Sequence, residues 1–165
     1  MPLLLRKIRK SRWYKYPWLE EGGSQADALL DLKTDDNILS VWYIEDDKSN
    51  LERVLAALAS NSDNISNVDY ALFEEQDMLN MDIKLDSTKG NVPDDEVSNS
   101  WHRHLSELSA MKLAMIAKTI QTVGEIDRKQ PQEVKKLLKE SVVAGKIESS
   151  KLNPKIRAAI DPKVG

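Results

Sequence analysis

The sequence predicts an α+β fold in which a small antiparallel sheet from the N-terminal half packs against a long central helix and C-terminal helices. Strand-like patterns precede residue 93 and helix-like patterns follow it, an order typical of this class. Apolar residues make up 41% of the 165 residues, which is enough for a hydrophobic core. The length suits a single domain over residues 1–165, with a possible division into a sheet-rich part, 1–92, and a helical part, 93–165.

The first half contains the strand candidates. Residues 3–16 mix apolar side chains with cations, which suits a strand or an extended arm. Residues 38–44 are rich in β-branched and aromatic side chains, so we expect a buried strand that pairs with residues 26–32 as a hairpin. Residues 79–85 alternate apolar and polar side chains, which predicts a strand with one buried face. Residues 68–73 fit either a strand or a short helix.

Three helices have start signals in the sequence. Ser49 and Glu52 have the spacing of a capping box, in which two side chains satisfy free backbone N–H groups at a helix start. Pro131 suits the first position of a helix, because its ring presets the backbone angle. Asn153 and Pro154 predict a cap and a first turn for a short last helix.

The longest predicted helix follows a turn at residues 89–93. Acidic residues 94–96 stand where a helix N-terminus favours anions, and apolar residues recur every three or four positions over 97–123. This pattern predicts one helix of about 30 residues that stops at Gly124. The dense apolar run at 111–116 further predicts a helix that is covered on several sides.

The composition excludes several kinds of chemistry. The chain has no cysteine, which excludes disulfide scaffolds, thiol nucleophiles and cysteine-ligated zinc or iron–sulfur clusters. Neither a phosphate-binding glycine motif nor a G-x-S-x-G elbow is present, so we expect no small-molecule cofactor. No apolar run reaches the roughly 18 residues of a membrane span. We therefore predict a cytoplasmic protein that does not contact membranes.

The net charge of −3 conceals blocks of opposite sign. Residues 1–25, 26–100 and 101–165 carry net charges of +4, −13 and +6. Segregation of this kind concerns surfaces and partners rather than the fold. The leading hypothesis is a non-enzymatic interaction protein that presents these acidic and basic surfaces to a protein partner or to a second copy of itself. Apolar surface from the long helix or from residues 38–44 would add affinity.

The N-terminal basic block suggests an alternative, a nucleic-acid-binding accessory protein. Its cations would neutralise phosphates, the four aromatic residues between 13 and 18 would stack on unpaired bases, and the lysines between 129 and 157 would add contacts. The block equally fits an edge strand, whose cations deter edge-to-edge pairing while its tryptophans anchor the core. The candidate residues for binding a partner or nucleic acid are Arg6, Lys7, Arg9, Lys10, Arg12, Trp13 and Lys15.

A third hypothesis, a small hydrolase or nuclease, depends on the two histidines of the chain. His102 and His104 fall in the long predicted helix, where Glu107 would face His104. Two positions apart on a helix, the histidines would point about 200° from each other and could not share a metal. These three residues are the catalytic candidates, although no complete catalytic set is visible. The acidic clusters lack the spacing of a nuclease core, so we expect no metal site.

Overall fold

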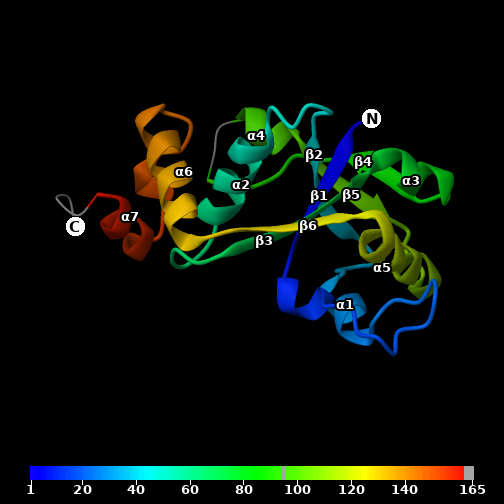
Figure 1. Cartoon of the computed structure of the whole chain (residues 1–165). Helices are drawn as coiled ribbons and strands as arrows, with labels where there is room; N and C mark the ends of the chain where they lie inside the picture. The colour runs from blue at the N-terminus through cyan, green and yellow to red at the C-terminus, as the bar shows by residue number, and fades with distance from the viewer. Residues whose placement is uncertain (94–95, 162–165) are drawn as a thin grey trace.

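The computed structural model describes residues 1–93 and 96–161, which form one antiparallel sheet with helices on both of its faces (Figure 1). The strands are β1 (Leu3–Ile8), β2 (Leu39–Ile44), β3 (Val68–Glu74), β4 (Lys84–Ser87), β5 (His102–Ser106) and β6 (Glu125–Lys129). The helices are α1 (Ala26–Asp31), α2 (Leu51–Ser60), α3 (Glu75–Asn80), α4 (Glu96–Ser100), α5 (Ala110–Val123), α6 (Pro131–Val143) and α7 (Pro154–Ile160), with 3₁₀ turns η1 (Lys10–Trp13) and η2 (Ser149–Lys151). The predicted α+β class is confirmed.

The first strand lies at the centre of the sheet, whose order is β4-β5-β2-β1-β3-β6. It pairs with β2 on one side and with β3 along its whole length on the other. Its apolar side chains alternate between two cores, with Leu5 in the core beneath α2, α6 and α7 and Leu4 in the core against α1 and α5 (Figure 1). The edge-strand interpretation is wrong for this segment, because β1 is hydrogen-bonded to a neighbouring strand on each side.

The predicted hairpin before β2 does not form, because α1 is a helix. Ala28 and Leu32 lie four residues apart and are both buried, which is the spacing of one helical face. The chain then turns through Asp36 and Asn37, which have left-handed φ angles of 53° and 60°. Asparagine and aspartate tolerate this conformation better than most residues, so the turn before β2 follows from local sequence.

The alternating segment at 79–85 is divided between two elements. α3 ends at Asn80 and β4 begins at Lys84. Between them the backbone N–H of Ile83 donates to the carbonyl of Met78 at 3.0 Å, which closes a turn around Asp82. Leu79 is 48% exposed, so the alternation does not describe one buried strand face.

The long helix predicted over residues 94–123 is interrupted by a strand. β5 pairs with β4 on one side and β2 on the other, so tertiary hydrogen bonds override the helical spacing of its apolar residues. Residues 94–95 of the prediction lie outside the described part of the chain. α5 buries Ile116 and Ile120 on one face and leaves Met111 75% exposed, so the helix is not covered on several sides.

Two of the predicted helix starts are confirmed in detail. Pro131 is the first residue of α6, and the side chain of Asn153 accepts a hydrogen bond from the backbone of α7. α2 has a different start from the predicted capping box. Asn50 occupies its N-cap position, and the Asn50 amide bridges the N–H of Glu45 and the carbonyl of Tyr43 at 2.8 and 3.0 Å.

The sheet combines strands from both parts of the sequence. β5 and β6 follow residue 93, yet they pair with β2, β4 and β3 from the first part. The single domain and its possible division near residue 92 stay predictions, as does the cytoplasmic location. Across residues 1–93 and 96–161, no helix is both long and apolar enough to cross a membrane.

We expect Gly124→Ala to destabilise the protein more than Gly145→Ala. A Cβ atom at Gly124 would lie 2.8 Å from the Ile120 Cα, so the end of α5 would have to move. Gly145 has a φ of +73° and open space around it, so alanine there adds only about 1–2 kcal/mol of backbone strain. Urea denaturation of both variants measures the difference, and equal losses would contradict the close approach at Gly124.

Candidate functional site

Two of the candidate binding residues, Arg6 and Trp13, belong to the scaffold. Arg6 donates to the carbonyls of Ser40 and Lys33 at 2.8 and 3.4 Å, and burial lowers the pKa of its guanidinium, an effect that Asp31 opposes. Trp13 is 5% exposed, and its indole Nε1 donates to Asp31 at 2.7 Å. Both side chains are committed to contacts within the chain.

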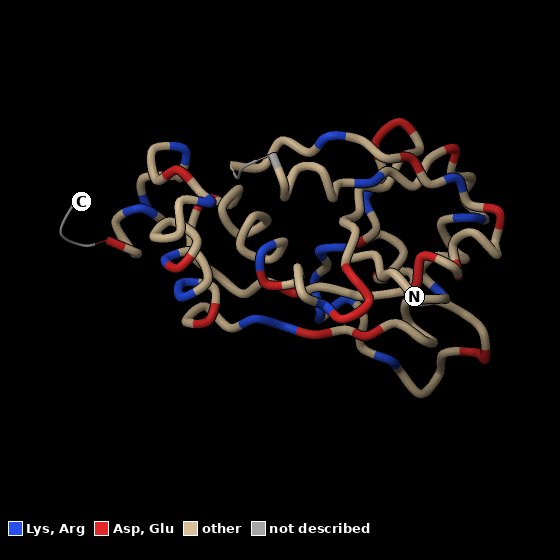
Figure 2. The backbone as a smooth tube through the Cα atoms, turned by 90° about the horizontal axis from the view of Figure 1, so that it is seen from above, with Lys and Arg blue, Asp and Glu red and all other residues tan. Residues whose placement is uncertain are grey.

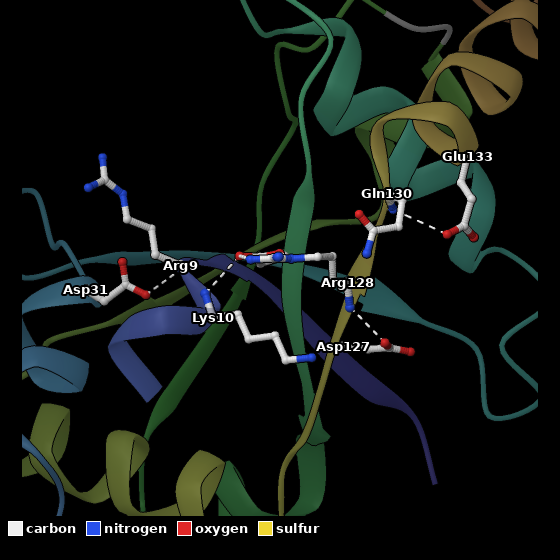
Figure 3. A network of polar contacts seen from close by, with 8 residues as sticks. Arg9, Lys10, Asp31, Asp127, Arg128, Gln130 and Glu133 are labelled. Atoms are coloured by element: carbon white, nitrogen blue, oxygen red, sulfur yellow. Dashed lines mark hydrogen bonds and ion pairs between the residues drawn. The ribbon is translucent and has the colours of Figure 1, made fainter. Parts of the chain in front are cut away.

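Three further candidates, Lys7, Arg9 and Arg12, have different surroundings. Lys7 is an exposed residue of β1. The Arg9 guanidinium extends away from Lys10 in Figure 3, although the two residues are adjacent in sequence. Arg12 lies 3.9 Å from Asp27, and this exposed ion pair takes up part of its charge. The residues of the predicted binding segment therefore differ in their contacts, and their role in binding stays a prediction.

Three aromatic rings remain exposed just after η1. Tyr14 is 63%, Tyr16 45% and Trp18 71% exposed. Their rings contact one another in series, since the Tyr14 and Tyr16 centroids are 4.9 Å apart and edge to face, whereas Tyr16 and Trp18 are 5.5 Å apart and stacked at 12°. Scattered apolar exposure is ordinary, but three contacting aromatic rings in water indicate a contact surface.

The segment that carries these rings is attached to the scaffold at both ends. Its start is held by Trp13, which is buried against the sheet. Its far end is held by Gln25, whose backbone N–H donates to the Gln121 side chain at 3.0 Å while the Gln121 amide donates back at 2.6 Å. Gln25 is 3% exposed. The rings are thus presented by a loop of defined position.

A hollow of about 470 Å³ lies between η1 and β6, and one of the three exposed rings, Tyr14, lines it. Its lining residues are Lys10, Ser11, Trp13, Tyr14, Lys15, Ile126 and Arg128. Three of them are cations, and no carboxylate among the described residues lines the hollow. Sequence reasoning missed Ile126 and Arg128, because only the pairing of β6 with β3 brings them to the N-terminal segment.

We call Lys10, Tyr14, Lys15, Tyr16, Trp18 and Arg128 the aromatic–basic surface. Asp69 of β3 holds two parts of it together. The Arg128 Nε and Nη2 atoms donate to Asp69 at 2.6 and 3.2 Å, and the backbone N–H of Lys10 donates to the same carboxylate at 2.9 Å. In Figure 3 Lys10 and Arg128 accordingly come close together from η1 and β6. Burial alone would raise the pKa of Asp69, but these donors and charges hold it below its ordinary value.

The two histidines lie on a strand rather than on a helix. Residues two apart on β5 share a face, and the rings of His102 and His104 are 4.9 Å apart. The prediction that they point away from each other is therefore wrong. His102 also lies 5.0 Å from the Trp42 ring, and its Nδ1 is 2.9 Å from the Thr88 hydroxyl.

Glu107 lies beyond the end of this strand, so its predicted contact with His104, which needed helical spacing, is wrong. It has a left-handed φ of 53°, and its exposed carboxylate is 3.9 Å from the Lys84 amine. Among residues 1–93 and 96–161, no group of three or more His, Asp and Glu side chains could hold a metal ion. His102 thus packs between Trp42 and His104 on the sheet, and a catalytic role of His102, His104 and Glu107 stays a prediction.

Part of the charge that is segregated along the sequence is paired in the fold. Ion pairs join basic residues of one block to acidic residues of another, and Figure 2 shows Lys and Arg next to Asp and Glu along β6 and α6. These pairs are Met1–Asp46, Arg12–Asp27, Lys48–Glu125, Asp69–Arg128 and Lys84–Glu107. Arg12–Asp27 and Asp69–Arg128 neutralise charge of the dominant sign in their blocks, whereas Lys48–Glu125 and Lys84–Glu107 pair the lysines of the acidic block with glutamates of the basic block.

Comparison with known proteins adds no function to this geometry. No family model, curated protein or solved structure matches the chain. The functional argument therefore depends on the aromatic–basic surface and on its contacts.

We expect Asp69→Asn to lower the free energy of unfolding at about pH 7 by roughly 1.5–3 kcal/mol, because hydrogen bonds to a charged carboxylate are lost. Urea denaturation measures this change. Asp63→Asn, an exposed substitution of the same type, should stay within about 0.5 kcal/mol of the unchanged protein. Similar values for both variants would contradict the role of Asp69.

The free energy of unfolding should also fall as the pH drops below about 6.5, the ordinary pKa of histidine. Burial and the charge of His104 lower the pKa of His102 in the folded protein, so the unfolded chain binds the proton more readily. His102→Gln should make the pH dependence between 7 and 5 shallower, as measured by thermal or urea denaturation. An unchanged slope would contradict the burial of a neutral imidazole.

Proposed function

We propose that this chain is a non-enzymatic binding protein that engages a negatively charged ligand through its aromatic–basic surface. The observation that supports the proposal is the exposure of Tyr14, Tyr16 and Trp18 beside lysines, on a segment attached at both ends. Tryptophan and tyrosine are enriched among residues that dominate binding energy. Attachment at both ends also reduces the conformational entropy that this segment loses when a ligand binds.

The sign of the ligand charge follows from the ion pairs around the hollow. The charge of the Asp69 carboxylate is neutralised by the Arg128 guanidinium. The amines of Lys10 and Lys15 form no salt bridge with any described residue. The lining therefore retains an excess of positive charge, which attracts an anionic ligand and accelerates its encounter. An acidic protein segment and a nucleic acid both satisfy this requirement.

The proposal agrees with the predicted non-enzymatic interaction protein, but it assigns the binding affinity to a different surface. Residues 38–44 were expected to offer apolar surface to a partner, yet Val41 and Ile44 are fully buried within the sheet. The long helix that was expected to offer the same is interrupted by β5, although α5 still exposes Met111 and Val123. The proposal instead places the affinity in the exposed rings after η1, because these rings contact one another in series and Tyr14 lies beside lysines.

Substitution of the most exposed ring tests the proposal. Two fluorescein-labelled anionic probes, a twelve-residue Glu-rich peptide and a twelve-nucleotide oligo-dT, are titrated with protein while the fluorescence anisotropy is measured. We expect at least one probe to bind, and Trp18→Ala to weaken that binding by roughly tenfold. Leu30→Ala, a 67% exposed apolar residue of α1, should leave binding unchanged. Absence of binding by both probes, or equal losses in both variants, would overturn the proposal.

A further inference from the structure

We infer that the ligand of the aromatic–basic surface is a single-stranded nucleic acid. The inference rests on the proposed function and names its ligand class. Unpaired bases would stack on the exposed rings of Tyr16 and Trp18, while the neighbouring phosphates would lie in the hollow between η1 and β6. Each part of this arrangement has its own structural basis.

The rings have the geometry that stacking requires. Tyr16 and Trp18 are nearly parallel, with 12° between their planes, so they already form a short stack that a base can extend. Trp18 is 71% exposed, which leaves indole surface open to such a base. Every base has a flat π-face, so a platform of this kind accepts a strand without reading its sequence.

The hollow provides phosphate ligands, and the ring series reaches it through Tyr14. Lys10, Lys15 and Arg128 line it, together with the hydroxyl-bearing Ser11. Tyr14 belongs both to the hollow and to the ring series, because it lines the hollow and its ring contacts Tyr16. Cations and rings are therefore continuous, as alternating phosphates and bases are along a strand.

Arg128 is oriented before any ligand arrives. Two of its nitrogens, Nε and Nη2, donate to Asp69, which fixes the plane of the guanidinium. Its Nη1 atom has no hydrogen-bond partner among the described residues, so its donors remain open to an anion. A guanidinium in a fixed plane suits the oxygen geometry of a phosphate.

The same features favour a single strand over a duplex and over an acidic peptide. Bases in a duplex are stacked on each other and paired, so their faces are closed to Tyr16 and Trp18. An acidic peptide without aromatic residues would satisfy the lysines but offers no flat ring to the stack. Glu20 and Glu21 follow Trp18 and are exposed, so phosphates are disfavoured there and belong on the side of Lys10 and Lys15.

The experiment measures fluorescence anisotropy with labelled oligo-dT at about 50 mM and about 200 mM salt. Three phosphate contacts predict a slope of about −2 in log affinity against log salt, so binding should weaken roughly fifteen- to twentyfold across this range. Trp18→Ala should weaken binding roughly tenfold at both salt concentrations, because stacking is not a charge effect. Circular dichroism establishes that each variant is folded.

Matched charge variants separate this site from general electrostatic attraction. The double variant Lys10→Gln and Lys15→Gln should reduce the salt effect to about two- to threefold, since one phosphate contact remains. The double variant Lys135→Gln and Lys139→Gln removes the same charge from an exposed face of α6 and should leave binding unchanged. Equal losses in the two double variants would overturn the inference.

The Glu-rich peptide and an oligo-dT·oligo-dA duplex complete the test. Tighter binding of the single strand than of either competitor supports the inference. Binding of the peptide alone, with loss in Trp18→Ala, would overturn the nucleic-acid ligand and leave the proposed function standing. Equal binding of duplex and single strand would overturn base stacking, and absence of binding by all three probes would overturn both proposals.

Discussion

The carboxylate of Asp69 joins three segments that are far apart in sequence, and the candidate site depends on it. It projects from β3, binds the Arg128 side chain of β6 and accepts the backbone N–H of Lys10 at the start of η1. Its side chain is only 11% exposed, so an ionised group there requires these donors. The contact therefore stabilises the sheet edge and places two cations of the aromatic–basic surface beside each other.

A second constraint is the central position of β1. Because β1 lies in the middle of the sheet and its end pairs with β3 at Asp69, the residues that follow β1 emerge next to the Asp69 carboxylate. Trp13 then buries its ring against the sheet, and the next aromatic residues are left outside. The basic and aromatic segment near the N-terminus thus contains both buried side chains that hold the fold together and exposed rings. Arg6 and Trp13 stabilise the fold, whereas Lys10, Lys15 and Trp18 are free to contact a ligand.

The errors of the sequence predictions share one physical cause. Periodicity reports which residues are apolar, but a short apolar segment takes the backbone conformation that its neighbours can hydrogen-bond. β5 is a strand because β2 and β4 flank it, and the histidines consequently share a face. The charge blocks were misjudged in a similar way. Contacts between distant segments pair some of these charges, as Arg128 of the basic C-terminal block pairs with Asp69 of the acidic block.

The sequence by itself determined the α+β class and the buried strand before residue 45. It also determined the starts of α6 and α7, because proline and asparagine act through local backbone geometry. It also located the basic and aromatic residues near the N-terminus. Only the tertiary structure decided which of them face solvent, and only the pairing of β6 with β3 brought Arg128 to them. The physical reason is that side-chain exposure and ion pairing depend on contacts between distant segments, which local spacing does not encode.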